Sequence, residues 1–406
     1  MLHRRALLGT AAATLAAPGL IRAQGSTPIR IGEINSYSAQ PAFTLPYRNG
    51  MELAIDEINV TNTSAGRGGA LGRKLEILVR DDAGKPQDAI RLAGELAGDQ
   101  KVDLLAGGFL SNVGLALADY ALQNKRLFVA GEPLSDALVW EKGNRYTYRL
   151  RPSTYMQAAM LVADAAKLPA KRWVTVAPNY EYGQSAVKWF KALLLAKRPD
   201  VQFVAEQWPA LGRIDAGATV QALAQANPEA IFNVTFAADL TNFVRAGNTR
   251  NLFDKRSVVS LLTGEPEYLD PLGDEAPDGW IVTGYPVADV GTTANKAFVA
   301  AYTDRFKAPP RMGSVVGYAL IHSIAAGIAK TGGTETEAMA DGFGGARFDT
   351  PIGTASYRAI DHQGTLGGYV GMLGNKDGRG VMTNWRYVDG ADVLPTDDEV
   401  RKLRPG

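Results

Sequence analysis

Short apolar runs alternate with longer amphipathic stretches along the first third of the chain. The runs are rich in Val, Ile and Leu and lack strict polar alternation, which is typical of strands covered on both faces of a parallel sheet. The longer stretches have apolar residues at helical spacing, which predicts helices between the strands. We expect strands at residues 29–31, 75–79, 102–106 and 127–130, and helices at 48–59, 87–97 and 115–122. This alternation indicates βαβ units and an α/β fold.

The same alternation begins again in the middle of the chain. It predicts strands at 173–176, 201–205, 230–234, 258–262 and 280–282, and helices at 156–166, 185–196, 216–226 and 241–246. A chain of 406 residues is longer than the roughly 100–200 residues of an ordinary domain. The two comparable blocks therefore indicate two similar lobes rather than one large sheet.

The last third of the chain departs from this order. Two long helices, at 297–306 and 314–329, precede short strands near 354–357, 368–372 and 384–388. A tail that completes both lobes would make the chain cross between them three times. The predicted boundaries are residues 28–148 plus 286–350 for the first lobe and 149–285 plus 351–406 for the second. Lobes of this kind bind ligands beyond the carboxyl ends of their strands and trap them by hinge closure.

The first 23 residues have the layout of an export signal. A basic patch that contains Arg4 and Arg5 precedes an apolar run over residues 6–17, and the segment ends on the small residue Ala23. The adjacent arginines suggest the twin-arginine route. Because the apolar run is shorter than the about 20 residues that span a bilayer, we expect residues 1–23 to be cleaved. No later stretch reaches that length uninterrupted, so we expect a soluble periplasmic protein.

Composition narrows the function further. Lys and Arg total 43 against 42 Asp and Glu, so the chain lacks the basic excess of a nucleic-acid binder. Cys is absent, which excludes disulfides, thiolate metal sites and a cysteine nucleophile. No Gly-rich phosphate loop and no dinucleotide fingerprint is present, so we expect no cofactor.

Residues suited to catalysis or metal binding are sparse. After the signal only His322 and His362 remain as histidines, which leaves a Ser-His-Asp triad and a His-based zinc site few ways to assemble. We interpret Asp81 and Asp82 as a helix cap or surface pair, because no other ligand cluster accompanies them. We therefore predict no catalytic residue and no metal ligand, and a binding protein rather than an enzyme.

Aromatic, hydroxyl and amide side chains gather in the loops that directly follow the predicted strands. Small polar residues at a helix start offer hydroxyls and backbone N–H groups that suit a carboxylate. Aromatic side chains suit the carbon skeleton of a ligand. The loops are residues 35–38, 107–112, 131–135, 179–183, 235–236 and 263–267. Because the ends of parallel strands meet at one edge of a sheet, these loops form the predicted site.

Five segments follow one another in a recognisable order: Ile31-Gly32, RNGMELAIDEIN at 48–59, GRKLE at 72–76, RDDAGKP at 80–86 and NYEYG at 179–183. Together they resemble the periplasmic substrate-binding proteins of ABC importers, of the leucine/isoleucine/valine-binding type. The resemblance covers nearly all of the chain after the signal. It implies two Rossmann-like lobes with a three-strand hinge, the type I periplasmic binding protein fold. It also implies ligand capture by closure and delivery to a membrane permease, without catalysis.

The resemblance places the ligand carboxylate at the strand-end loops of the first lobe, near Ser111 and the segment Gly131-Glu132-Pro133. The amino-acid-binding members tend to have small residues with Ser or Thr where this chain has that segment. Proline removes a backbone N–H, and a glutamate opposes a ligand carboxylate unless it is paired or points away. Whether Glu132 and Pro133 exclude α-amino acids is therefore left open.

The resemblance also places residues for the rest of the ligand. Phe43 matches an aromatic residue of the first long loop, and Tyr182 and Phe236 match aromatic residues of the second lobe. Glu265 falls near the acidic residue that binds an α-ammonium group. These assignments describe a cleft in which aromatic side chains contact the carbon skeleton of the ligand, and polar or acidic residues contact its charged groups.

The leading hypothesis is a monomeric receptor of an ABC importer that binds a small carboxylated ligand, a branched-chain or other apolar amino acid. Two alternatives stay open. One is a receptor of the same class for an aromatic acid, benzoate-like or cinnamate-like. The other is a ligand-sensing regulatory receptor of the same fold that passes closure to a different partner. An enzyme is a more distant third option.

Overall fold

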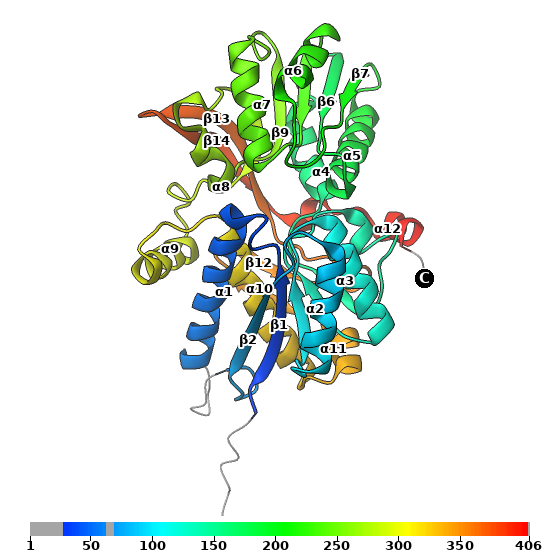
Figure 1. The fold of residues 1–406 in the computed structure, drawn as a ribbon, viewed down its shortest axis with the longest axis vertical. Helices are drawn as coiled ribbons and strands as arrows, with labels where there is room; N and C mark the ends of the chain where they lie inside the picture. The colour runs from blue at the N-terminus through cyan, green and yellow to red at the C-terminus, as the bar shows by residue number, and fades with distance from the viewer. Residues whose placement is uncertain (1–26, 62–68, 405–406) are drawn as a thin grey trace, which may run out of the picture.

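A computed structural model describes residues 27–61 and 69–404, which form two α/β lobes joined at a narrow junction (Figure 1). The first lobe lies at the bottom of the view and the second at the top. The export signal predicted at residues 1–23 lies outside the described residues. The α/β class, the two lobes and their parallel-sheet cores are confirmed.

The first lobe is built on a parallel five-stranded sheet in the order β2-β1-β3-β4-β5. Helix α1 packs along α10 on one side of this sheet, and α2 packs along α3 on the other. The strands are β1 (Ile29–Asn35), β2 (Leu75–Asp81), β3 (Leu104–Gly107), β4 (Phe128–Ala130) and β5 (Thr147–Arg149). The helices are α1 (Pro41–Thr61), α2 (Pro86–Gly98), α3 (Ser111–Asn124), α9 (Thr293–Phe306), α10 (Met312–Thr331) and α11 (Thr336–Gly342).

The second lobe is built on a seven-stranded sheet in the order β14-β13-β10-β9-β8-β6-β7. Its strands β6 to β10 run parallel, and β13 and β14 add an antiparallel edge. The strands are β6 (Arg172–Val176), β7 (Gln202–Gln207), β8 (Ala230–Asn233), β9 (Ser257–Gly264), β10 (Ile281–Gly284), β13 (Gly368–Lys376) and β14 (Arg379–Val388). The helices are α4 (Thr154–Ala165), α5 (Glu181–Lys197), α6 (Ala216–Gln225), α7 (Ala237–Thr249) and α8 (Pro266–Leu269).

The chain passes between the lobes after β5, after β10 and before β13. The third passage comes later than predicted. Strand β12 (Gly353–Ser356) pairs with β11 (Arg347–Thr350), and β11 packs on α10 of the first lobe. Residues 353–356 therefore belong with the first lobe, although we expected the second lobe to include everything from residue 351. At the other end, after α12 (Asp397–Leu403), Arg404 donates hydrogen bonds to the carbonyls of Val139 and Asn144 in the first lobe.

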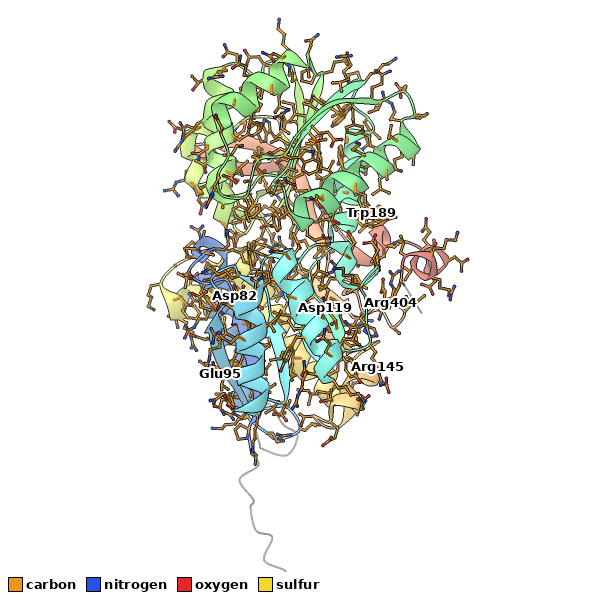
Figure 2. The ribbon with its side chains drawn as sticks, turned by 45° about the vertical axis from the view of Figure 1, so that its right-hand side comes forward. Asp82, Glu95, Asp119, Arg145, Trp189 and Arg404 are labelled. Carbon is orange, nitrogen blue, oxygen red and sulfur yellow. The ribbon has the colours of Figure 1, made fainter. Side chains whose placement is uncertain are left out.

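Three aromatic side chains bridge the lobes on one side of the junction. Trp140 follows the first-lobe turn η1 (Asp136–Leu138), Tyr155 lies on α4, and Trp189 lies on α5 of the second lobe. Their ring centroids lie 5.4 Å apart for Trp140–Tyr155, 4.9 Å for Tyr155–Trp189 and 5.7 Å for Trp140–Trp189, all in edge-to-face arrangements. Figure 2 shows Trp189 at the base of the second lobe, above Arg404. Edge-to-face contacts of this kind stabilise the packing of the two lobes.

Helices α1 and α10 approach so closely that glycine is required at their contact. A Cβ added at Gly317 would lie 2.0 Å from the carbonyl oxygen of Tyr47. This position in α10 therefore excludes every other residue unless the helices separate.

We expect Gly317→Ala to lower the free energy of unfolding by about 1–3 kcal/mol, because the added methyl group overpacks this contact. Gly94→Ala is the matched control, since nothing lies within 4 Å of a Cβ added at that position of α2. That variant should raise stability by about 0.5–1 kcal/mol, the usual gain of Ala over Gly in a helix. Urea unfolding of both variants measures their free energies of unfolding. Equal values for the two variants would contradict the close approach of α1 and α10.

Helix α10 is also long and apolar enough to cross a membrane by length and composition. Most of it is buried inside the protein, against α1 and β11. It is the one such helix among residues 27–61 and 69–404. Its apolar character is accounted for by this burial in the first lobe.

Candidate functional site

Aromatic rings from both lobes meet where the carboxyl ends of the two sheets face each other. The first lobe contributes Phe43 on α1 and Phe109 in the loop after β3, with ring centroids 5.3 Å apart. Phe109 lies 6.2 Å from Phe236, which precedes α7 of the second lobe. Phe236 in turn lies 5.8 Å from Tyr182 on α5 and 6.0 Å from Tyr268 on α8. The rings form one continuous apolar surface across the junction.

A small cavity lies among these rings. It has a volume of about 20 Å³, which is room for one water-sized group. Its lining comes from both lobes and consists of Phe109, Ser111, Glu132, Leu134, Tyr180, Tyr182, Phe236, Leu262 and Tyr268. A larger ligand body can enter only when the rings of the two lobes move apart, as a hinge between lobes allows.

A buried ion triad lies beside the ring cluster. Arg151, in the passage from β5 to α4, makes ion pairs with Glu132 of the first lobe and Glu265 of the second. All three side chains are at most 3% exposed. The guanidinium also lies 5.4 Å from the centroid of the Phe43 ring, within cation–π range. The triad therefore links both lobes and the hinge, and its net charge depends on how many of its two carboxyls are ionised.

Burial shifts the pKa values of this triad. It raises the pKa of the Glu132 carboxyl to about 8, and Arg151 opposes this rise only in part. The pKa of Glu265 is also raised by burial, again against the effect of Arg151. Burial disfavours the charged form of Arg151, but the two carboxylates outweigh it and raise the pKa of the guanidinium. Arg151 therefore stays charged, while Glu132 titrates near neutral pH.

Each carboxylate of the triad keeps an oxygen without a hydrogen-bond partner within the described part of the chain. These atoms are Oε2 of Glu132 and Oε2 of Glu265. The hydroxyls of Tyr182 and Tyr268 are likewise buried without a partner among residues 27–61 and 69–404. Unsatisfied buried polar atoms are rare in folded proteins and call for a ligand, a water or another explanation.

Ser111 lies at the start of α3 and lines the same cavity. Its Oγ accepts a hydrogen bond from the backbone N–H of Ser135, at 3.1 Å. The residue before it, Leu110, provides no side-chain cap for the helix. The hydroxyl proton of Ser111 and the first N–H groups of α3 are therefore suited to an anionic group.

A third carboxylate joins the lobes at another place. Glu267 on α8 of the second lobe accepts hydrogen bonds from the backbone N–H groups of Met312 and Gly313, at 3.2 and 2.5 Å. These N–H groups belong to the first turn of α10 in the first lobe. Burial raises the pKa of Glu267, and the two N–H donors counteract that rise. A carboxylate at a helix N-terminus is a favourable pairing, which here stabilises contact between the lobes.

Comparison with known proteins identifies the family to which the chain belongs. Residues 28–379 match the sequence model of the periplasmic binding proteins. The chain belongs to the periplasmic binding protein family. Two relatives are a Leu/Ile/Val-binding protein BraC3 from Rhizobium johnstonii and a Leu/Ile/Val-binding protein homologue from Brucella melitensis. The first is 28% identical over 47% of this chain and half of its own length, and the second is 24% identical over 78% of this chain and 83% of its own.

A solved structure shares the fold of this periplasmic binding protein. It is a solute binding protein of an ABC transporter from Rhodopseudomonas palustris BisB5, in complex with 3,4-dihydroxybenzoic acid. The TM-score is 0.79 at 24% identity, over 89% of this chain and 98% of the other. The resemblance inferred from the sequence is thereby confirmed at the level of family and fold.

The structure brings most of the predicted site residues together. Four of them, Ser111, Glu132, Tyr182 and Phe236, line the aromatic cavity. Phe43 lies in the ring cluster beside Arg151. Their role in ligand binding stays a prediction.

The other two predicted residues, Gly131 and Glu265, do not line the aromatic cavity, and their role in ligand binding also stays a prediction. Gly131 allows a close approach, because a Cβ there would lie 2.6 Å from the Tyr47 hydroxyl. Glu265 pairs with Arg151 and lines a separate cavity of about 20 Å³ behind it, rather than the aromatic cavity.

Sequence reasoning missed Arg151 and Tyr268. Arg151 belongs to the segment Tyr148-Arg149-Leu150-Arg151, in which arginines alternate with apolar residues across the end of strand β5. Charged side chains flanked by apolar ones at an expected hinge crossing are a signal for buried ion pairs. Tyr268 gives no such signal, because it follows the strand-end loop by one residue and only the fold brings it to Phe236.

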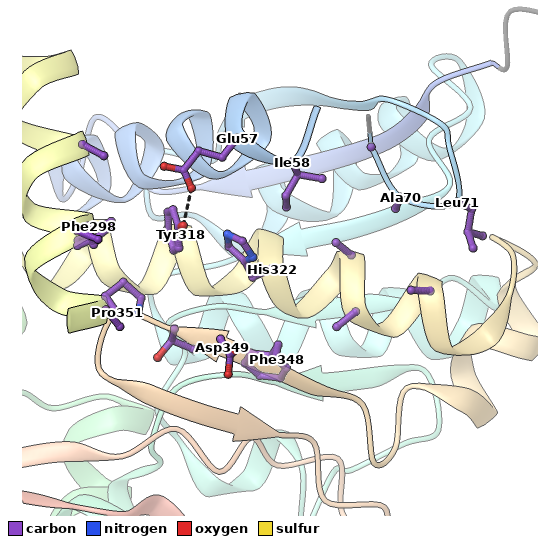
Figure 3. Close-up of a pocket in the computed structure, with 18 of the residues that line it drawn as sticks. Glu57, Ile58, Ala70, Leu71, Phe298, Tyr318, His322, Phe348, Asp349 and Pro351 are labelled. Atoms are coloured by element: carbon purple, nitrogen blue, oxygen red, sulfur yellow. Dashed lines mark hydrogen bonds between the residues drawn. The ribbon is translucent and has the colours of Figure 1, made fainter. Parts of the chain in front are cut away.

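A larger hollow lies elsewhere, in the first lobe (Figure 3). It is a groove of about 1230 Å³ along α10, lined mostly by small and apolar residues of α1, the loop 69–72, α9, α10 and β11, together with Glu57, His322 and Asp349. The Tyr318 hydroxyl donates a 2.5 Å hydrogen bond to Glu57 across it. Its lining comes from the first lobe alone, unlike that of the aromatic cavity between the lobes. Within residues 27–61 and 69–404, no group of three or more His, Asp and Glu side chains is placed to hold a metal ion.

Proposed function

We propose that this protein is the periplasmic solute receptor of an ABC importer, which captures a small apolar amino acid between its lobes and delivers it to a membrane permease. The observation that carries the proposal is the aromatic cavity, because it lies at the strand ends of both lobes and has polar groups at its rim. Ligands of open α/β sheets bind at such strand ends. Closure of two lobes on one ligand needs no catalytic group.

The chemistry of the cavity fits the parts of an apolar amino acid. Ser111 and the N-terminus of α3 are suited to the α-carboxylate. The rings of Phe109 and Phe236 are suited to an apolar side chain. The Rhizobium and Brucella relatives, both named as Leu/Ile/Val-binding, support the same ligand class.

An aromatic acid is the second candidate ligand. The number of rings around the cavity favours it, as does the Rhodopseudomonas palustris structure in complex with 3,4-dihydroxybenzoic acid. Where it is ionised, the buried carboxyl of Glu132 disfavours such a ligand, since a second negative charge would then lie beside the first.

A thermal-shift screen of amino acids, aromatic acids and short aliphatic acids tests the proposal. A ligand that binds the native state raises the melting temperature, so apolar amino acids should give the largest rise. A screen in which none of these compounds raises the melting temperature would overturn the proposed function.

We expect Ser111→Ala to weaken binding of the best amino acid by about 1–3 kcal/mol, the usual contribution of a hydrogen bond to a charged group. Ser257→Ala is the matched control, because Ser257 lies at the opposite, N-terminal end of β9. Isothermal titration calorimetry measures both variants. An unchanged affinity in Ser111→Ala would remove Ser111 from the carboxylate site.

A further inference from the structure

Three carboxyl groups and one guanidinium are buried together where the lobes meet. Glu132 belongs to the first lobe, Glu265 and Glu267 belong to the second, and Arg151 lies in the first hinge crossing. The triad side chains are at most 3% exposed, and Glu267 is 1% exposed. Glu267 has two backbone N–H donors at the start of α10. Among the described residues, Arg151 is the one cation that pairs with Glu132 and Glu265.

The Glu132–Glu265 pair has more carboxyls than the positive charge beside it can neutralise. Within the described ranges, no Lys, Arg or His lines the aromatic cavity, and Arg151 alone of these types lines the cavity behind the triad. Oε2 of each carboxyl accepts no hydrogen bond from the described part of the chain. With both carboxyls ionised, one negative charge would be neither paired nor solvated, which is costly in a protein interior.

We propose that closure of the lobes takes up one proton, which binds to the Glu132–Glu265 pair, so that a fall in pH favours the closed form of the empty protein. The proton belongs to the pair rather than to either residue, because two carboxyls that share one guanidinium titrate together. This goes beyond the proposed function, since it concerns the hinge and requires no ligand. In the proposed receptor, the acidity of the surroundings would set the fraction of empty molecules that are closed.

Hinge opening separates the two carboxyls, because each belongs to a different lobe. Glu132 lies two residues after β4, and Glu265 directly follows β9, so both lie at strand ends that face the other lobe. In an open form water reaches both carboxyls and stabilises their charged state, which returns their pKa values toward the ordinary range of glutamate. In the closed form, burial raises the pKa of Glu132 to about 8 and raises the pKa of Glu265 as well. The two forms therefore bind different numbers of protons between about pH 5 and about pH 8.

The groups around the pair add to this difference. Burial is the largest cause of the raised pKa of both carboxyls, the charge of Glu267 adds to the rise, and Arg151 opposes it. Four tyrosines from α1, α8 and the start of α5 also face the pair, and burial raises their pKa values, so they stay neutral. The charged and titratable groups that act on the pair are thus Arg151, Glu267, Tyr47, Tyr180, Tyr182 and Tyr268.

Small-angle scattering of the ligand-free protein at about pH 8.5 and about pH 5.5 tests the proposal. The closed form has the higher pKa values, so it binds the proton more tightly and gains population as the pH falls. The ratio of closed to open molecules should rise by up to about tenfold for each pH unit over which the two forms differ by one proton. The radius of gyration should therefore be smaller at the lower pH.

Isosteric variants of either carboxyl mimic the protonated pair. Glu132→Gln and Glu265→Gln each leave Arg151 with one carboxylate, so each variant should have the smaller radius of gyration at both pH values. Glu33→Gln is the matched control. Glu33 is fully buried and its pKa is also raised to about 8 by burial, but the other groups that act on it, such as Tyr37, all belong to the first lobe. This variant should keep the pH dependence of the wild type, and circular dichroism checks that all three variants fold.

Each outcome supports or overturns the proposal. A wild-type radius of gyration that is the same at both pH values would overturn it. A pH dependence that persists in Glu132→Gln or in Glu265→Gln would also overturn it, because the proton would then bind elsewhere, as would a pH dependence lost in Glu33→Gln. None of these measurements uses a ligand, so their failure leaves the proposed function to the thermal-shift screen, and a screen without a binding compound leaves this proposal standing.

Discussion

Arg151→Met is expected to lower the free energy of unfolding by about 3–5 kcal/mol, the largest loss of stability that we predict for a single substitution. The guanidinium is the charge partner of two carboxylates that are at most 3% exposed. Its removal would leave Glu132 and Glu265 buried next to each other without compensation. Desolvation of an unpaired charge costs more than the ion pair contributed when it was intact.

Urea unfolding at about pH 8 and about pH 5 measures this loss and its cause. The pKa values of Glu132 and Glu265 are raised in the folded protein, so both carboxyls take up protons more readily than in the unfolded chain as the pH falls. The loss in Arg151→Met should therefore be smaller at about pH 5 than at about pH 8. The triple variant that adds Glu132→Gln and Glu265→Gln should recover most of the lost stability. A loss of equal size at both pH values would show that Arg151 acts through packing alone.

Glu267→Ala should weaken ligand binding about 100-fold, while the two lobes remain folded. Glu267 of the second lobe accepts two charge-assisted hydrogen bonds from the start of α10 in the first lobe, each worth about 1.5–3 kcal/mol. These bonds exist only when the lobes are in contact, so their loss shifts the population toward the open form. If the ligand binds between closed lobes, as proposed, a smaller closed population lowers the apparent affinity.

Calorimetry and small-angle scattering with saturating ligand test this prediction together. Glu267→Gln keeps an acceptor oxygen but not the charge, so its affinity should lie between the wild type and Glu267→Ala. An Ala variant with wild-type affinity and unchanged scattering would show that this contact does not govern closure.

The alternation of strands and helices could be predicted because it depends on local periodicity. Strand β2 begins at Leu75 as expected, and α6 begins at Ala216. Helix starts were less predictable. Helix α3 begins at Ser111, although apolar spacing pointed to residue 115, because Ser, Asn and Gly occupy its first turn. The first turn contains Ser111, a predicted ligand-binding residue. The helix start was therefore predicted wrongly at a residue of the candidate site.

The charged part of the site depends on contacts between residues far apart in sequence. Glu132, Arg151 and Glu265 are joined only because β4, the hinge and α8 converge at the junction. No spacing rule links positions separated by 114 residues, as Arg151 and Glu265 are. Glu265 was therefore predicted as an ammonium ligand on family resemblance, whereas the structure shows it paired with Arg151. The late passage of the chain to β13 was missed for the same reason, since the β11–β12 pair is fixed by packing on α10.

The edge-to-face contact of Trp140 and Trp189 allows separation of the lobes to be followed by intrinsic tryptophan fluorescence. One indole belongs to each lobe, and their centroids lie 5.7 Å apart with Tyr155 against both. Separation of the lobes would expose both indoles to solvent and shift their emission to longer wavelength. Solute capture can thus be timed by stopped-flow fluorescence on the unlabelled chain, without any attached dye.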